Sequence, residues 1–167
     1  ARLASVAQHA HADVRESILA LHTAPATDWV FLPTLRRYVE EFETQYGVTT
    51  KLTVDGVSDD SFPPHAGIQL LRVIQEAMTN ARRHGLAHTI SVAFERHGDE
   101  ARITVADDGQ GFDPLTLGAD GDGHLGLGFM RERMAQIDGS VTIDSSPGAG
   151  TQVHLTAPLI GGQEDAQ

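Results

Sequence analysis

Polar residues that could act on a nucleotide recur along one predicted helix. The stretch 68–84, IQLLRVIQEAMTNARRH, carries Glu76, Asn80 and His84 four residues apart, and Arg83 lies three after Asn80. Residues three or four apart share one side of an α-helix, so these side chains should lie on one line. An amide oxygen and a carboxylate can hold Mg²⁺ or its waters, and a guanidinium can bind phosphate. An ordinary solvated helix face remains the alternative for this helix alone.

A second candidate site follows a predicted strand. Asp107, Gly109 and Gly111 stand in the order Asp-x-Gly-x-Gly. A carboxylate there can accept a hydrogen bond from an exocyclic amine, and glycines let the backbone approach a flat ring or its phosphates. Adenine would satisfy both requirements, although a tight turn explains these residues equally well.

A second glycine set, in the stretch GHLGLGF, opens a predicted helix over 126–137. It consists of Gly123, Gly126 and Gly128. Backbone N–H groups at a helix start favour anions, so phosphate is expected against Gly126 to Gly128 once a lid closes.

A third glycine set consists of Gly148 and Gly150, followed by Thr151. It can be read as a hairpin turn. If the strand that begins at Thr151 is a neighbour of the strand that ends at Asp107, Thr151 places a hydroxyl beside that carboxylate.

The apolar pattern predicts the elements that position these groups. Helices are expected at 3–21, 32–46, 68–84 and 126–137, and strands at 48–54, 88–95, 100–106, 140–145 and 151–157. Residues 107–125, between the strand at 100–106 and the helix at 126–137, contain five glycines and are expected to form a lid. Long hairpins beside helices favour an α/β (α+β) two-layer sandwich, with a mixed, mostly antiparallel sheet covered on one face by helices. A Rossmann fold is disfavoured because no G-x-G-x-x-G joins a first strand to a helix.

Length and charge narrow the classes of partner. The 167 residues suit one domain with a small appendage, and 12 basic against 23 acidic residues give a net charge of -11. This charge repels nucleic acid and anionic membranes, so neither is predicted as a partner. Local arginines can still neutralise phosphate, and several cluster around the motifs: Arg72, Arg82, Arg83, Arg131 and Arg133. Without cysteine, the chain has no disulfide or thiolate metal site.

The order of the motifs resembles the ATP-binding fold shared by gyrase, Hsp90, MutL and the histidine kinases. The segments QEAMTNARRH, DDGQGF, GLGFMRERM and SSPGAGTQV look like the catalytic domain of bacterial two-component sensor histidine kinases, especially those paired with NarL/LuxR-type response regulators. The resemblance covers about 32–158. It implies an ATP-binding catalytic domain over 25–160, and ADVRESILAL is similar to the end of a second dimerisation helix, implied for 1–24. The polar residues 161–167 are expected to be a disordered tail.

The resemblance also implies a role for each matching residue on the helix predicted at 68–84. Asn80 would be the Mg²⁺ ligand, and Glu76 the accompanying catalytic acid, reaching the metal through water. Arg83 would face phosphate at a position where the family often has lysine, and His84 would be structural or adjacent to phosphate.

On the nucleotide's other side, the resemblance assigns Asp107 to the adenine amine, and Gly109 and Gly111 to the base and sugar. Thr151 would support adenine through water. The lid contacts would come from Gly123, Leu125, Gly126, Leu127 and Gly128, with Gly126 and Leu127 as hinge. The family's separate phenylalanine-containing motif is not evident between Gly111 and Gly123.

The family's acceptor histidine is followed by an acidic residue, and none of the nine histidines here is. We therefore expect the acceptor upstream of Ala1. The expected function is to bind Mg-ATP and donate the γ-phosphoryl group to a histidine on a dimerisation helix outside this chain. The expected partners are that phosphoacceptor domain, a homodimer partner and a NarL/LuxR-type response regulator, in the cytoplasm.

Two other functions fit the same motifs. One is an anti-sigma-factor-type protein serine kinase of the same fold, which ADVRESILAL and MRER argue against. The other is a non-catalytic nucleotide-sensing module whose site has decayed, which the intact Asn80, Asp107 and glycines make a weaker reading.

Overall fold

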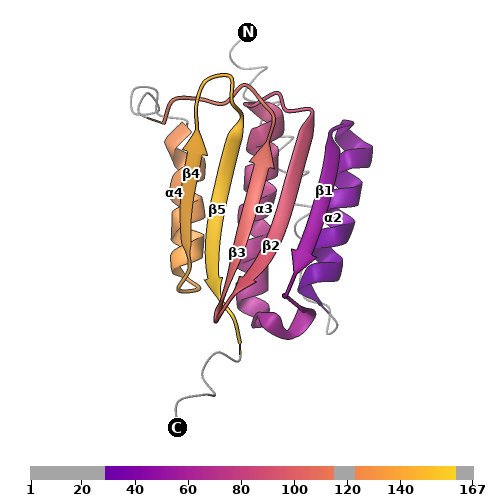
Figure 1. Ribbon diagram of the computed structural model, residues 1–167, viewed down its shortest axis with the longest axis vertical. Coiled ribbons are helices and arrows are strands. Elements are labelled where there is room, and N and C mark those ends of the chain that lie inside the picture. The colour runs from indigo at the N-terminus through magenta and orange to yellow at the C-terminus, as the bar shows by residue number, and fades with distance from the viewer. Residues whose placement is uncertain (1–28, 115–122, 161–167) are drawn as a thin grey trace, which may run out of the picture. The chain divides into compact units, whose positions relative to one another are not determined.

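The computed structural model of the chain describes residues 29–114 and 123–160 (Figure 1). The elements follow in the order α2 (Phe31–Tyr46), β1 (Thr49–Asp55), the 3₁₀ helix η1 (Asp59–Ser61), α3 (Pro64–Arg83), β2 (Thr89–His97), β3 (Glu100–Asp107), α4 (Gly123–Ala135), β4 (Ser140–Ser145) and β5 (Thr151–Pro158). Each element predicted within these residues is present. The expectations for 1–24 and 161–167 lie outside the described residues.

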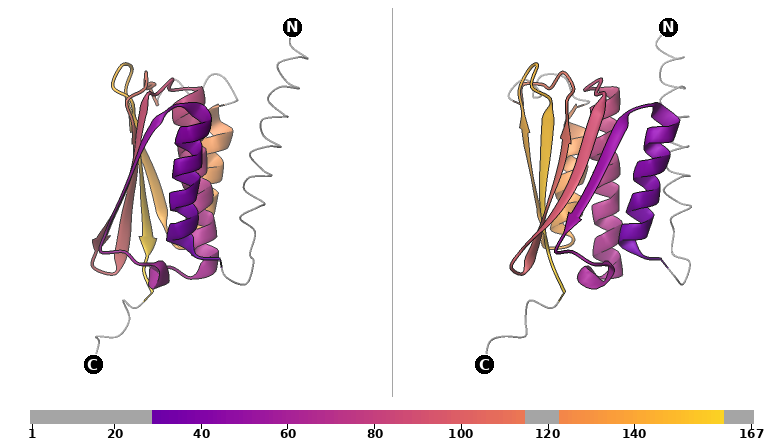
Figure 2. Two further views of the ribbon diagram at one scale, coloured as in Figure 1. Left: turned by 90° about the vertical axis from the view of Figure 1, so that its right-hand side faces the viewer. Right: turned by 45° about the vertical axis from the view of Figure 1, so that its right-hand side comes forward.

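Five strands form one sheet in the order β1-β2-β3-β5-β4. The β1–β2 pair is parallel and is connected through α3, whereas the β2–β3, β3–β5 and β4–β5 pairs are antiparallel. Helices α2, α3 and α4 all lie against the same face of this sheet (Figures 1 and 2). The predicted two-layer sandwich with a mixed, mostly antiparallel sheet is confirmed.

The chain divides into two compact units after Val30. The sheet and its three helices belong to the second unit, Phe31–Gln167. Within the described part of the chain, no helix is both long and apolar enough to cross a bilayer.

Helix α3 is the central helix of the layer, because it contacts both α2 and α4. The predicted apolar stripe is buried at Leu71, Ile74, Met78 and Ala81, while Ile68 keeps partial exposure. Burial extends further round the helix than one stripe requires, and it includes the polar residues Gln75 and Thr79. A helix with neighbours on both sides has little solvent-exposed surface. The alternative that its polar residues form an ordinary solvated face is therefore disfavoured.

An aromatic cluster fixes the start of α2 to the sheet. The ring of Phe31 meets Phe62 edge-on at 5.6 Å between centroids and meets Phe94 of β2 at 5.9 Å. All three side chains are buried. Edge-to-face aromatic pairs of this kind stabilise a core by about 1 kcal/mol beyond the area that they bury.

The structure corrects the predicted connection between β2 and β3 and one residue of the predicted apolar face of α4. The connection between β2 and β3 is shorter than the predicted 96–99, because strand pairing continues to His97 and Glu100 and only Gly98 and Asp99 form the turn. The φ of +61° at Gly98 suits the first position of such a two-residue turn. Met130 and Met134 of α4 are buried as the predicted apolar face requires, and so is Ile137 just beyond the helix, but Phe129 is 54% exposed.

Candidate functional site

The last row of residue pairs at one end of the sheet contains the predicted adenine-side residues. Asp107 of β3 pairs with Ile90 of β2 on one side and with Thr151 of β5 on the other, and Thr151 pairs with Ser145 of β4. Paired residues in a sheet point to the same face, and Ile90 is buried. Asp107, Thr151 and Ser145 therefore lie on the helix-covered face. Because β3 and β5 are neighbours, the prediction that Thr151 lies beside Asp107 is confirmed.

The environment of Asp107 differs from that of an exposed carboxylate. Partial burial raises the pKa of the Asp107 carboxyl, and the backbone N–H groups of Gly109 and Thr151 oppose this rise by hydrogen bonding to it. The Gly109 N–H donates to Asp107 Oδ1 at 2.8 Å. The carboxyl is thus held in one orientation by the backbone, and it keeps lone pairs with which to accept from a ligand.

The segment after Asp107 is fastened to the carboxyl end of α3. The Gln110 backbone N–H donates to the Gly85 carbonyl at 2.7 Å, and the Gln110 side-chain amide donates to the His84 carbonyl at 2.7 Å. On its other side the Gln110 carbonyl accepts from the Gly148 N–H at 2.6 Å. One glutamine thereby joins α3, the Asp-x-Gly-x-Gly segment and the β4–β5 turn.

The two glycines of this segment are needed by the chain itself. A Cβ at Gly109 would lie 2.5 Å from the Gly85 carbonyl oxygen. Gly111 has a φ of +60°, and a Cβ there would collide with the Ser146 carbonyl oxygen. The predicted reason for these glycines, close approach to a base or phosphate, is therefore not required to explain them, because close approach to the protein's own backbone already does so.

Gly111→Ala is expected to destabilise the fold by about 3 kcal/mol, since left-handed strain and a backbone collision add. Gly148→Ala is the matched control, because its φ of +81° is also positive but nothing lies within 4 Å of its added Cβ. The control should lose about 1 kcal/mol, from strain alone. Urea unfolding of the two variants measures the difference, and equal losses would contradict the predicted collision.

The predicted metal-side residues meet α4. The Asn80 amide nitrogen donates to Glu76 Oε1 at 3.4 Å. A Cβ at Gly126 of α4 would lie 2.7 Å from that same Glu76 oxygen and 3.6 Å from the Asn80 amide nitrogen. Because the amide nitrogen faces Glu76, the amide oxygen is the atom of Asn80 that is left to bind a cation.

Helix α4 begins at Gly123, three residues earlier than predicted. The N–H groups of Leu127 and Gly128 consequently lie inside the helix, where they bond to carbonyls of its first turn. The predicted helix start at Gly126 is therefore wrong. The phosphate contact at Gly126 to Gly128 and the hinge at Gly126 and Leu127 stay predictions. The N–H groups that have no partner within the helix are those of its first turn, Gly123–Gly126, which includes Leu125.

Two of the arginines near the motifs have structural contacts away from Asn80. The guanidinium of Arg82 lies 4.1 Å from the centre of the Tyr46 ring on α2, and Arg133 of α4 donates to the Gln69 side chain at 2.9 Å. Both contacts join α3 to a neighbouring helix. Of the predicted residues at the end of α3, Arg83 is half-buried and His84 is exposed, and the His84 N–H bonds to the Asn80 carbonyl at 2.9 Å.

The structure therefore brings the predicted residues into two clusters. Glu76, Asn80 and Gly126 form one, and Asp107 and Thr151 form the other with their neighbours. Gly85 connects them, because its N–H bonds to the Asn80 carbonyl at 3.1 Å and its carbonyl accepts from Gln110. No group of three or more histidine, aspartate or glutamate side chains arranged to hold a metal occurs in the described ranges.

Three residues of the site were missed by sequence reasoning: Asp108, Gln110 and Ser145. The Asp108 carboxylate accepts from the backbone N–H groups of His88 and Thr89 at 2.8 and 2.9 Å, and these bonds lower its pKa. It is a structural residue that fixes the start of β2. The sequence signal for Asp108 is its place in the acidic pair that begins the segment DDGQGF. The prediction assigned a role only to the first acid of that pair, Asp107.

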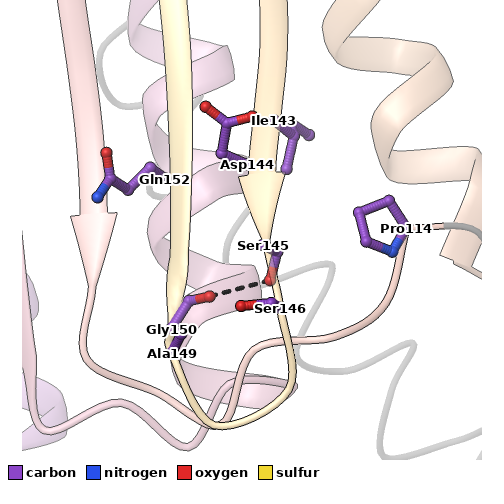
Figure 3. Close-up of a pocket in the computed structure, with 8 residues that line it drawn as sticks. All are labelled: Pro114, Ile143, Asp144, Ser145, Ser146, Ala149, Gly150 and Gln152. Atoms are coloured by element: carbon purple, nitrogen blue, oxygen red, sulfur yellow. Dashed lines mark hydrogen bonds between the residues drawn. The ribbon is translucent and has the colours of Figure 1, made fainter.

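A hollow of about 410 Å³ lies at the open edge of β4, next to the β4–β5 turn (Figure 3). It is lined by Pro114, Ile143, Asp144, Ser145, Ser146, Ala149, Gly150 and Gln152. None of the residues predicted to bind nucleotide lines it. It lies on the far side of Thr151 from Asp107 in strand order, so we do not assign the nucleotide to it.

Fold and site together define an α/β sandwich with an acid at a strand end and an amide on the central helix. Residues 65–161 match the family described as histidine kinase-, DNA gyrase B-, and HSP90-like ATPase. The chain belongs to this family, and it is an ATP-binding domain.

The relatives of the chain are sensor histidine kinases. It is 32% identical over 148 residues to the signal transduction histidine-protein kinase/phosphatase DegS of Brevibacillus brevis, covering 89% of this chain and 37% of DegS. It is 31% identical over 131 residues to the sensor histidine kinase YxjM of Bacillus subtilis (strain 168), covering 78% of this chain and 31% of YxjM. The chain thus spans about a third of the length of these curated relatives.

A solved structure shares the fold. The histidine kinase domain of the blue-light activated histidine kinase from Erythrobacter litoralis EL346 superposes with a TM-score of 0.65 at 21% identity, covering 87% of this chain and 72% of that domain. At this identity the likeness concerns the fold alone.

Proposed function

We propose that this domain binds Mg-ATP between α3 and the segment after β3, and donates the γ-phosphoryl group to a histidine on a dimerisation helix outside this chain. One observation carries the proposal. The Glu76–Asn80 pair and the Asp107–Thr151 pair are held at fixed positions relative to each other by the bonds from Gln110 to Gly85 and His84.

The proposed site has an end for the base and an end for the phosphates. Asp107 would accept from the adenine amine, with Thr151 beside it and Gly109 and Gly111 shaping the backbone near base and sugar. Arg83 and the N–H groups of the first turn of α4, Gly123 to Gly126, would bind phosphate, with Leu125, Leu127 and Gly128 in the same part of the chain. We place His84 near the phosphates, as a residue that acts through its backbone.

The residues present fit a magnesium ion. Mg²⁺ prefers oxygen ligands, keeps several waters and is usually held by one or two protein oxygens together with nucleotide phosphates. Asn80 would supply the amide oxygen, and Glu76 would hold a coordinated water. When bound, the ion would neutralise phosphate charge at this end of the site.

Phosphoryl transfer needs placement and charge neutralisation more than covalent help from the protein. In this chain the Asn80 amide and Arg83 would fix the triphosphate, and Asp107 would fix the base at the opposite end. Glu76, at 3.4 Å from Asn80, would orient the incoming imidazole or a water.

The partners proposed for the parent protein are its own dimerisation and phosphoacceptor domain, a homodimer partner and a NarL/LuxR-type response regulator, in the cytoplasm. The support is the likeness of the four motif segments to that subfamily. We propose the ATP-binding catalytic domain at 25–160, and the end of a dimerisation helix before it. The sensor-kinase relatives favour histidine over serine as the acceptor.

Phosphotransfer from γ-labelled ATP tests the proposal. The chain alone should retain almost no label, because none of its nine histidines precedes an acidic residue. Adding the parent protein's dimerisation segment should give an acid-labile, base-stable phosphohistidine on that segment. Label on serine would support the serine kinase instead, and nucleotide binding without any transfer would support a sensing module.

A further inference from the structure

The hydroxyl of Ser145 has three hydrogen-bond partners at the end of the sheet. It donates to the Gly150 carbonyl at 2.9 Å, accepts from the Phe112 N–H at 3.0 Å, and lies 3.0 Å from the Thr151 hydroxyl. Figure 3 shows the bond to Gly150 across the β4–β5 hairpin. No role in the proposed function has been given to this serine.

The proton count of these bonds sets the direction of the third one. A serine hydroxyl has one proton and two lone pairs. A carbonyl only accepts and a backbone N–H only donates, so the Ser145 proton is used at Gly150 and one lone pair at Phe112. All three bonds form together only if Thr151 donates its own proton to Ser145.

Thr151 is left with acceptor lone pairs only. Its single proton points to β4, on the side away from Asp107, because β5 lies between β3 and β4. The Asp107 carboxylate on the paired residue is also an acceptor when it is ionised. The site residues contributed by β3 and β5 therefore present acceptors and no side-chain donor.

Two acceptors distinguish purines by the group at position six. Adenine has an amine there, which donates, whereas hypoxanthine and guanine have a carbonyl, which accepts. The distinction persists through one bridging water. Such a water gives both protons to Asp107 and Thr151 and turns its lone pairs to the purine, where an amine fits and a carbonyl does not.

We propose that Ser145 sets the preference of this site for a 6-amino purine over a 6-oxo purine, by taking the proton of the Thr151 hydroxyl. Ser145 is a positioning residue that acts through Thr151, and the inference rests on the proposed placement of the base at Asp107. Without Ser145, the Thr151 hydroxyl can turn and donate, to a 6-oxo group or to the bridging water.

The test is the ratio of the dissociation constants of ITP and ATP, measured by calorimetry with Mg²⁺ present. In Ser145→Ala this ratio should fall roughly three- to tenfold, the effect of one neutral hydrogen bond. Ser146→Ala is the matched control, a neighbouring exposed serine whose side chain is not part of this network, and it should leave the ratio unchanged. Ser145→Thr keeps the hydroxyl and should restore the ratio of the unmodified chain.

The ratio separates this role from a merely structural one. Loss of affinity for both nucleotides by the same factor in Ser145→Ala would overturn the inference and leave Ser145 as a clamp for Phe112 and Gly150. If that variant is too unstable to titrate, Thr151→Val must lower the ratio, and an unchanged ratio overturns the inference equally. Failure of the unmodified chain to prefer ATP over ITP would refute the base placement itself, and with it the proposed site.

Discussion

Asp107→Asn is expected to lower the affinity of the chain for ATP by roughly 10- to 150-fold, the range for loss of a hydrogen bond to a charged group. Asparagine can keep its oxygen toward the Gly109 N–H, as Asp107 does at 2.8 Å. Its amide nitrogen would then face the adenine amine, so two donors would meet where a donor and an acceptor met before. Calorimetric titration with Mg-ATP measures the effect.

Asp108→Asn is the matched control, since it removes the charge of the adjacent carboxylate. That carboxylate binds the N–H groups of His88 and Thr89 at the start of β2. It should change unfolding stability and leave ATP affinity within about twofold, the scale of surface charge effects. Equal losses of ATP affinity in the two variants would show that negative charge at residues 107 and 108 supports binding and that Asp107 does not bind the adenine amine.

The pH dependence of ATP affinity is a second test of the role predicted for Asp107. Burial raises the pKa of Asp107, so its acceptor form is present above that raised pKa and is lost as the pH falls through it. ATP affinity should therefore decline on acidification at a higher pH than an ordinary carboxyl would give. The decline should be absent from Asp107→Asn, which has no proton to gain at that position.

Asn80→Ala is expected to remove the Mg²⁺ dependence of ATP binding. Affinity measured with Mg²⁺ should fall roughly 10- to 100-fold, the range for loss of a group that supports a bound metal, and should approach the value measured in EDTA. The physical reason is that the amide nitrogen of Asn80 is used at Glu76, which leaves the amide oxygen to bind the cation.

Gln69→Ala provides the control on the same helix. Gln69 also carries an amide, but that amide binds Arg133 at 2.9 Å at the other end of the α3–α4 contact. Its loss should leave the difference between Mg²⁺ and EDTA intact. If Asn80→Ala keeps that difference as well, the metal is held by other groups and the assignment of Asn80 is wrong.

Local patterns predicted most of this fold because its elements are long and periodic. Helix α3 has an apolar residue at almost every third or fourth position, and β3 alternates between buried and exposed residues. The residue order around Asp107 was also sufficient to place that carboxylate at a strand end. In each case the signal lies within one short stretch, where spacing and side-chain type carry the information.

The start of α4 was not predictable in the same way. Glycine is a poor helix former, and Gly123, Gly126 and Gly128 indicated a loop up to the middle of the motif. In the structure these glycines lie within α4, which packs against α3. Contacts between segments far apart in the sequence can override local propensity, and no local pattern records them.

Backbone contacts between distant segments were also hidden. The bonds from Gln110 to Gly85 and His84 use main-chain carbonyls as acceptors. Because every residue has a main-chain carbonyl, the residue types do not predict these bonds. Ser145 reads as an ordinary polar residue at the end of a strand. Its importance appears only when its three partners are counted in space.

The strand order has a consequence for how the chain acquires its nucleotide site during synthesis. Thr151 belongs to β5, the last strand described, yet β5 lies between β3 and β4, so β4 reaches the sheet only through it. Closing that long, non-local ladder is the slow kind of event in folding. A nascent chain that ends before Thr151 would carry Asp107 and Asn80 without the hydroxyl that pairs with Asp107, and the proposed purine site would be completed only when β5 enters the sheet.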